Sequence, residues 1–153
     1  PRSTLFPYTT LFRSALETSM LPKLLSTLPS FIAYFAVAVA LLAAFLLIYV
    51  NVTPYNELVL IEQGNTAAAI SLSGALIGFA MPIANVIAHS DSLADLAAWG
   101  AIAGLIQLLT YLVVRLTLPR LAVDIPSGKI SEATLLAALS VVIGLINAAC
   151  MTY

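Results

Sequence analysis

The chain has 153 residues, of which 61% are hydrophobic and only 8% are charged. Soluble domains are roughly 45–50% apolar and about 25% charged, so these few charges cannot cover a water-facing surface. The net charge of -1 offers no basic surface for nucleic acid, and the single cysteine, Cys150, allows no internal disulfide. The composition excludes soluble enzymes, nucleic-acid-binding proteins and disordered regulators, and it predicts a multi-pass membrane protein.

The N-terminal segment needs separate treatment, because targeting and non-native segments do not report on a fold. Residues 1–14, PRSTLFPYTTLFRS, resemble the in-frame translation of a short-read sequencing adaptor, and the chain does not begin with Met. We interpret residues 1–19 as this adaptor followed by upstream sequence, and we expect the native chain to start at Met20. The alternative is a real leader, but the segment lacks the pattern of a signal or transit peptide.

Four stretches lack Asp, Glu, Lys and Arg and are long enough to cross roughly 30 Å of hydrocarbon, which takes about 20 helical residues. They are residues 31–50, 67–88, 96–114 and 133–151. Backbone polar groups in a bilayer must be bonded within their own segment, so each stretch is predicted to be an α-helix. The predicted fold is all-α, a polytopic membrane bundle of four transmembrane helices. Pro82 predicts a kink in the second of them.

A shift of 64 residues superposes the first two spans on the last two. It places Ile61-x-x-Gly64 on Ile125-x-x-Gly128, just before the second span of each half. We interpret this match as an old tandem duplication of a two-helix unit, with repeats at residues 20–88 and 89–153. Each unit crosses the membrane twice, so the repeats should run parallel, unlike the inverted repeats that build substrate sites in many transporters.

The distribution of basic residues in the short loops predicts the orientation in the membrane. The loops after the first and third spans carry Arg115, Arg120 and Lys129, whereas the opposite side carries only Lys23 once residues 1–19 are set aside. We therefore expect both termini on the non-cytoplasmic side of a bacterial inner membrane and the two longer loops in the cytoplasm.

Small residues at four-residue spacing indicate helix faces on which backbones can approach closely. Three such stripes occur: Gly74 and Gly78 in the second span, Gly100 and Gly104 in the third, and Ser140, Gly144 and Ala148 in the fourth. They predict a tightly packed bundle.

The polar side chains within the predicted spans are all neutral, so a proton relay through the bilayer has no obvious carrier. The amides Asn85, Gln107 and Asn147 are the most demanding of them, because each needs several hydrogen-bond partners. They either bond neighbouring helices together or line a polar path through an assembly.

The charged side chains of the two longer loops are candidates for a docking surface whose halves differ in sign. Glu57 and Glu62 lie in the first loop, and Arg115, Arg120 and Lys129 follow the third span. The alternative is ordinary solvated loop charge in contact with lipid headgroups.

Catalytic and metal-binding patterns are weak. His89, Asp91 and Asp95 lie near one another in the remaining loop and could bind a divalent ion, although a polar exposed loop is the simpler interpretation. No Ser-His-Asp, HExxH, P-loop or GxGxxG pattern pairs a nucleophile with a base. We expect no catalytic, cofactor or metal site, and a protein that is not an enzyme.

Four segments point to a family: TPYNE at residues 53–57, GNTAA at 64–68, WGAIAGLIQLL at 99–109 and INAACMTY at 146–153. Together they resemble the YjfL-like bacterial inner-membrane proteins built from domain of unknown function 350, over residues 20–153. The resemblance implies two tandem two-helix copies, no established activity, and an association with envelope-stress or membrane-scaffold proteins. Lys129 stands where the first copy has Asn65, so any role of that asparagine is not duplicated.

Two functional hypotheses follow. The first is a non-enzymatic structural or accessory membrane component that forms homo-oligomers or docks another membrane or scaffold protein, with the lipid bilayer as its surroundings. The alternative is a small oligomeric channel or carrier lined by Asn85, Gln107 and Asn147. A membrane enzyme ranks third, because the sequence offers no nucleophile with a base.

Overall fold

The computed structural model describes residues 7–90 and 92–151, and within residues 7–21 it describes the side chain of Met20 alone. Residues 1–6 of the predicted adaptor segment and Asp91 of the predicted polar loop therefore lie outside the described residues. The elements are α1 (Pro7–Val52), α2 (Glu57–Glu62), α3 (Thr66–His89), α4 (Leu93–Thr117), α5 (Leu121–Asp124) and α6 (Ile130–Cys150). Every regular element in this part of the chain is a helix, as predicted.

The chain divides into two compact units, Pro1–Phe35 and Ala36–Tyr153, and α1 contributes to both. In the first unit the rings of Phe31 and Phe35 stack with their centroids 5.8 Å apart. The second unit contains the remainder of α1 and all of the later helices. The fold and sites described below belong to this second unit.

Four helices are long and apolar enough to cross a membrane, which confirms the four predicted spans. The spanning segments are Pro22–Val52, Thr66–His89, Leu93–Thr117 and Ile130–Cys150. Each begins before its predicted span, in α3 and α4 because the capping side chains Asn65 and Ser92 set the helix start, which hydropathy does not report. Ser92, for example, accepts a hydrogen bond from the Ala94 N–H and adds a turn to α4. The third spanning helix therefore includes Asp95, and α3 runs on through Pro82.

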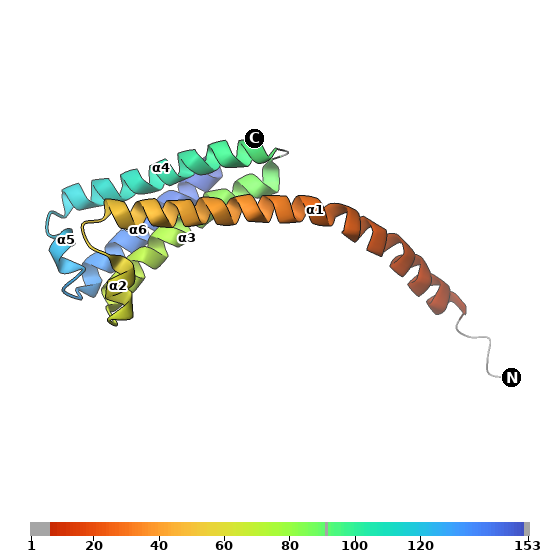
Figure 1. The fold of residues 1–153 in the computed structure, drawn as a ribbon, viewed down its shortest axis with the longest axis horizontal. Coiled ribbons are helices and arrows are strands. Elements are labelled where there is room, and N and C mark those ends of the chain that lie inside the picture. The colour runs from red at the N-terminus through yellow and green to blue at the C-terminus, as the bar shows by residue number, and fades with distance from the viewer. Residues whose placement is uncertain (1–6, 91, 152–153) are drawn as a thin grey trace. The chain divides into compact units, whose positions relative to one another are not determined.

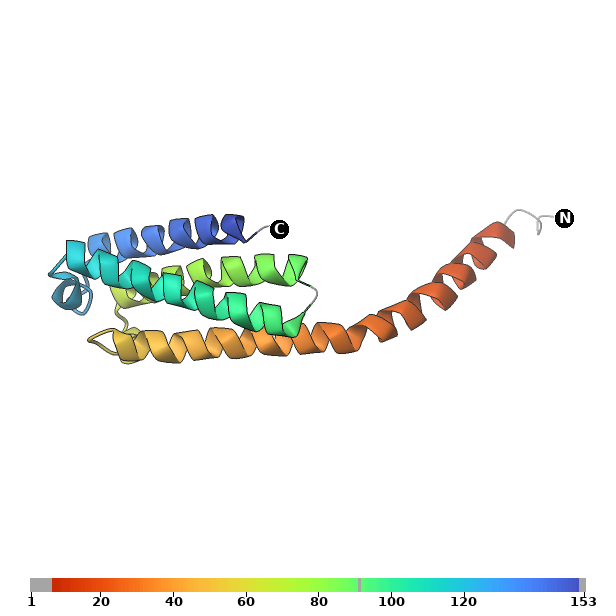
Figure 2. The ribbon, with the colours of Figure 1, turned by 90° about the horizontal axis from the view of Figure 1, so that it is seen from above.

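The centre of the bundle is the parallel pair α3 and α6, which share the most extensive contact between helices and lie side by side in Figures 1 and 2. Gly78 and Gly144 face each other there: a Cβ added to Gly144 would lie 2.6 Å from the Gly78 Cα. A Cβ on Gly74 would lie 2.9 Å from the Ala137 carbonyl oxygen. Glycine is needed at these positions because backbone fills the space that a side chain would take.

The glycines of α4 have a different setting. A Cβ on Gly104 would lie 3.4 Å from Phe79 and 3.8 Å from Phe45, which is ordinary contact with side chains. Phe45 of α1 and Phe79 of α3 stack with centroids 4.4 Å apart. The second segment of α1 therefore packs on α3 and α4 through aromatic side chains rather than through close backbone contact.

Both longer loops end in the same backbone motif. Gly64 and Gly128 have φ of +83° and +85°, a conformation that glycine adopts without strain. Each glycine N–H donates to the carbonyl three residues earlier, and the next N–H donates to the carbonyl five residues back, from Asn65 to Leu60 and from Lys129 to Asp124. This is the Schellman arrangement that ends a helix. The helices that flank these glycines also start 64 residues apart, at Glu57 and Leu121 and at Thr66 and Ile130.

The contact between α3 and α6 predicts that replacing a glycine by alanine lowers stability more in this contact than in α4. Gly78→Ala and Gly144→Ala should each lower the free energy of unfolding by about 1–3 kcal/mol, because a methyl group forces rigid backbones apart. Gly104→Ala is the matched control and should change stability little. Thermal unfolding in detergent followed by circular dichroism measures all three. Equal stability of the three variants would contradict this packing.

Candidate functional site at the loop end of the bundle

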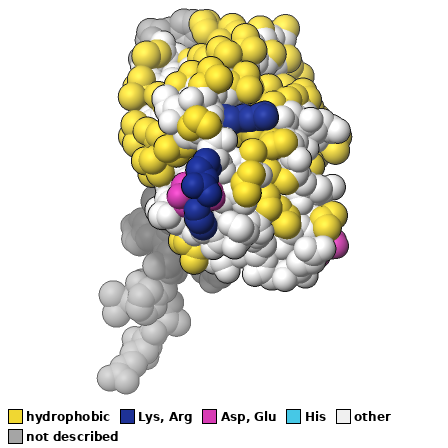
Figure 3. Space-filling model, turned by 90° about the vertical axis from the view of Figure 1, so that its left-hand side faces the viewer, with side chains coloured by type: hydrophobic (Ala, Val, Ile, Leu, Met, Phe, Trp, Pro, Cys, Tyr) yellow, Lys and Arg dark blue, Asp and Glu magenta, His cyan; other side chains and the backbone are white. Residues whose placement is uncertain are grey.

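The two longer loops, with α2 and α5, lie at the same end of the second unit, whereas the turn between α3 and α4 lies at the other end (Figure 1). We call the former the loop end. Figure 3 looks at this face and shows Lys, Arg and acidic side chains among hydrophobic ones. The loop end holds the candidate residues Glu57, Glu62, Asn65, Arg115, Arg120 and Lys129, and the structure gives them unlike environments.

Glu57 differs most from the expected exposed loop charge, because it is fully buried, with 0% of its surface exposed. Asn56 caps α2 by accepting a hydrogen bond from the Val59 N–H, and this start turns Glu57 inward. The Thr53 hydroxyl donates to Glu57 Oε2 at 2.8 Å. Oε1 has no hydrogen-bond partner among the described residues. Glu57 therefore cannot form part of a solvent-facing docking surface.

Three tyrosines with buried hydroxyl oxygens interact electrostatically with this carboxylate. Tyr49 comes from α1, Tyr55 from the turn before α2, and Tyr111 from α4; the rings of Tyr49 and Tyr111 meet edge to face with centroids 5.5 Å apart. Every pair among the three phenols and Glu57 interacts electrostatically. We call these four residues the Glu57 cluster. It joins α1, α2 and α4.

Glu57 and Tyr55 are the two members of the cluster that lie outside the membrane spans, and burial is the largest influence on the pKa of each. It raises the pKa of Glu57 to about 7, against smaller opposing effects of the Thr53 hydroxyl and a backbone N–H. It also raises the pKa of the Tyr55 hydroxyl well above its usual range; Tyr111 and Glu57 add to this rise, and the positive charge of Arg115 opposes it. Glu57 is thus poised to change its charge near neutral pH.

Asn65 connects the two longer loops. Its Oδ1 accepts a hydrogen bond from the Ala68 N–H at 2.9 Å and so caps α3. Its Nδ2 donates to the carbonyl oxygens of Ile125 and Pro126 at 3.1 and 2.9 Å. Lys129 occupies the matching position before α6 but makes no side-chain cap. Asn65 therefore acts in the first half alone, as the difference between the two halves implies.

The remaining charged candidates lie nearer the surface. Lys129 forms an ion pair of 2.7 Å with the buried Asp124. Glu62 and Arg120 are exposed, and Arg115 is half-buried beside the phenols. The expected surface with halves of opposite sign is therefore reduced, because Glu57 is buried and Lys129 is paired within its own loop.

A polar groove of about 420 Å³ lies between the two longer loops. Both positive-φ glycines, Asn65 and Ser127 contribute to its lining, and the N-termini of α3 and α6 adjoin it. The positive ends of two long helices favour acidic groups on whatever occupies the groove.

The amides of the spans take part in helix packing. Asn85 Nδ2 donates to the Ala148 carbonyl at 2.8 Å, and Gln107 Nε2 donates to the Ser140 carbonyl at 3.3 Å. Both bonds connect neighbouring helices to the backbone of α6, and Asn147 is buried on α6 itself. Asn85 thus bonds α3 to α6, and Gln107 bonds α4 to the same helix.

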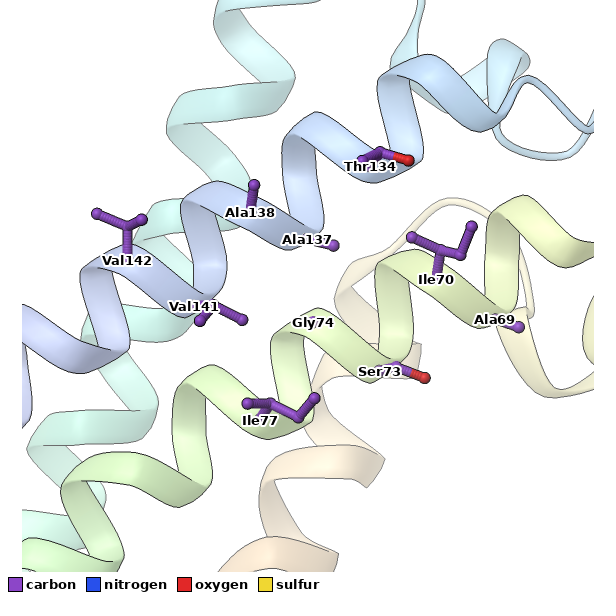
Figure 4. Close-up of a pocket in the computed structure, with 10 residues that line it drawn as sticks. All are labelled: Ala69, Ile70, Ser73, Gly74, Ile77, Thr134, Ala137, Ala138, Val141 and Val142. Carbon is purple, nitrogen blue, oxygen red and sulfur yellow. The ribbon is translucent and has the colours of Figure 1, made fainter.

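A second groove, of about 660 Å³, runs along the seam between α3 and α6 (Figure 4). Its floor is made of small residues, among them Gly74 and Ala137, and its rim of residues such as Ile77 and Val142. The groove offers apolar contact within the membrane span, and its lining carries no ionisable side chain.

No group of three or more metal-binding side chains gathers anywhere in the described part of the chain. His89 Nδ1 lies 2.8 Å from the Asn85 carbonyl oxygen in its own helix, and Asp95 lies in the first turn of α4.

Sequence reasoning found the loop end but missed the Glu57 cluster, because its members are distant in sequence and sit at span ends, where tyrosine is common. One signal was present. The 64-residue shift places Glu57 on Leu121, which is fully buried at the start of α5. A glutamate aligned with a leucine in the other half is a sequence pattern that indicates a buried carboxylate.

The helices and the loop end define a multi-pass membrane protein with four apolar helices and a polar face at one end. The chain belongs to the family described as Domain of Unknown Function (DUF350), whose profile matches residues 23–151. It is 39% identical over 130 residues to the UPF0719 inner membrane protein YjfL of Escherichia coli (strain K12), covering 85% of this chain and 98% of that one.

The comparison with the UPF0719 transmembrane protein YshE of Bacillus subtilis (strain 168) gives 32% identity over 92 residues, covering 60% of this chain and 69% of the relative. No solved structure matches. The relatives confirm a multi-pass inner-membrane protein of the predicted family, of uncharacterised activity. The single family match spans both proposed repeats, so the tandem copies stay a prediction, as does the adaptor origin of residues 1–14.

Replacements of Asn65 separate its two roles. Asn65→Ala should lower the free energy of unfolding by about 2 kcal/mol, because it removes both the α3 cap and the bridge to the second loop. Asn65→Ser keeps a capping oxygen and should lose about half as much. Chemical denaturation in detergent measures both, with Ser92→Ala, at the exposed cap of α4, as the control for losing a cap alone. If Asn65→Ser matched the wild type, the bridge would contribute nothing.

Proposed function

We propose that this protein is a non-enzymatic accessory component of the bacterial inner membrane whose loop end docks a partner protein through an acidic segment. The observation that carries this proposal is the polar groove between the two longer loops. Its walls come from both halves of the chain and are held together by the Asn65 bridge. A groove built this way keeps its shape, and preorganised surfaces bind with a smaller entropic penalty.

The chemistry of the partner follows from the charges around the groove. Two helix N-termini adjoin it, and the exposed Arg120 begins α5 at the loop end, whereas Lys129 is already paired with Asp124 and the exposed Glu62 adds one negative charge. Complementary charge mainly speeds association and selects among partners. An acidic segment of a membrane or membrane-scaffold protein suits this surface, and a second copy of the chain is the alternative occupant.

The channel or carrier hypothesis receives less support. The Asn85 and Gln107 amides are turned toward carbonyl oxygens of α6, where they contribute to packing rather than to an open polar path. A solute flux in proteoliposomes that Asn85→Leu or Gln107→Leu abolishes, with folding intact, would instead favour the channel.

Two further parts of the proposal concern topology. The loop end faces the cytoplasm, since three of the basic residues beyond residue 19 lie there. The chain arose by tandem duplication, which is supported by the helix starts and glycine turns that recur at a spacing of 64 residues.

Site-specific crosslinking tests the docking proposal. A photoreactive amino acid at Gln63 or Ser127, on the groove, should capture a defined partner in the native membrane. One at Leu105, on the exposed apolar surface of α4, should capture lipid and no such partner. Arg120→Glu should reduce the yield several-fold by weakening charge complementarity. Differently tagged copies distinguish a homo-oligomer. A monomer with no crosslinked protein at either groove position contradicts docking.

Reporter fusions test the orientation. A reporter that is active only outside the cytoplasm should work when fused after Tyr153 and fail when inserted after Gln63. The reverse pattern of activity would overturn the proposed topology.

A further inference from the structure

The Glu57 cluster is unusual because its polar atoms lack partners. Buried polar side chains in native proteins are hydrogen-bonded in the large majority of cases. In the described part of the chain four buried side-chain atoms have no partner with full hydrogen-bond geometry, and they are Glu57 Oε1 and the hydroxyl oxygens of Tyr49, Tyr55 and Tyr111, the last of which interacts with Arg115. All four belong to one cluster.

The polar side-chain atoms of the cluster are almost completely removed from solvent, so water does not provide the missing hydrogen bonds from the surface. Glu57 is 0% exposed, and Tyr49 and Tyr111 are each 1% exposed. An isolated ionised carboxylate in such a place is strongly disfavoured unless a positive charge and ligating atoms compensate it. The structure supplies four oxygen atoms that interact with one another yet form no hydrogen bonds among themselves.

The charges around the cluster define what it can accept. Arg115 of α4 is the cationic side chain that acts on it, and it acts on the phenols Tyr55 and Tyr111 rather than on the carboxylate. Lys129 at the same end is paired with Asp124. The groups that interact with Glu57 are Tyr49 from α1, Thr53 and Tyr55 from the turn before α2, and Tyr111 from α4. One carboxylate without a cationic partner balances a single positive charge.

We propose that Glu57 and the hydroxyls of Tyr49, Tyr55 and Tyr111 form a binding site for one small monovalent cation, either a proton or an alkali metal ion. Oxygen atoms are the ligands that hard cations prefer, and a single carboxylate is too little charge for a divalent ion. Because the ligands come from α1, α2 and α4, occupancy controls how α2 is held against the two spans. This inference does not depend on the docking proposal.

The sign of the pH dependence follows from burial. Burial raises the pKa of Glu57 to about 7, so the folded chain holds a proton that the unfolded chain has already released. The stability contributed by that proton is present at acidic pH and is lost as the pH rises through about 7. An alkali ion at the same site would favour the ionised carboxylate and lower the pKa.

Infrared difference spectroscopy tests the proposal on the full chain in lipid nanodiscs with isotopically labelled glutamate. The carbonyl band of a protonated glutamic acid should disappear with a midpoint near pH 7. Glu57→Gln should remove this transition, whereas Glu62→Gln, at an exposed position, should keep it. The temperature of unfolding should fall over the same pH range in the wild type and not in Glu57→Gln.

The tyrosines separate a binding site from an isolated buried carboxyl. Tyr49→Phe and Tyr111→Phe should each raise the midpoint by about one pH unit, because each removes a polar hydroxyl from around the buried carboxyl and makes its ionisation more costly. Tyr34→Phe, in α1 outside the cluster, is the control. Unchanged midpoints in the first two variants, or a wild-type spectrum without a titrating acid near neutral pH, would overturn the proposal.

Titrations in sodium, potassium and choline salts distinguish the ligands and need no variant. A midpoint that does not depend on the salt identifies the proton as the ligand. A midpoint that falls as sodium or potassium increases, but not with choline, identifies a competing alkali ion at the same oxygen atoms.

Discussion

The backbone contact between α3 and α6 is the constraint on which the rest of the bundle depends. Within a bilayer the surrounding lipid is as apolar as the side chains, so helices associate through close packing and hydrogen bonds rather than through the hydrophobic effect. Gly78 and Gly144 permit that close approach. Once these two helices are fixed, Gln107 reaches the Ser140 carbonyl and Asn85 reaches the Ala148 carbonyl, so α4 and the far end of α3 are tied to the same pair.

The same contact positions the loop end. Because α3 and α6 run parallel, their N-termini emerge together, and each is preceded by a glycine turn that reverses the chain. Asn65 can then cap one helix and bond the loop before the other. The polar groove is thus a consequence of the parallel pair, since antiparallel helices would place the two turns at opposite ends of the bundle.

The Glu57 cluster does not depend directly on the contact between α3 and α6, because its residues come from α1, α4 and the segment that contains α2. α1 contacts the bundle through side chains such as Phe45, and Tyr49 lies one turn further along the same face. A charge placed where α1 and α4 meet can therefore influence the helix that is least closely packed against the others. The structure combines a close-packed centre, set by glycine contacts, with a junction of buried polar groups around one carboxylate.

The sequence by itself determined the fold class, the four spans and the loops that share one end, because apolar length and the bilayer thickness leave few alternatives. It also identified Gly78 and Gly144 as small residues, although not as partners of each other. The burial of Glu57 and its gathering with three tyrosines were decided only by the tertiary structure. Hydropathy treats a loop glutamate as solvated, whereas the α2 cap and the meeting of α1 with α4 remove it from water. Local hydropathy identifies the segments that are buried in the membrane, and long-range packing decides which polar side chains are buried with them.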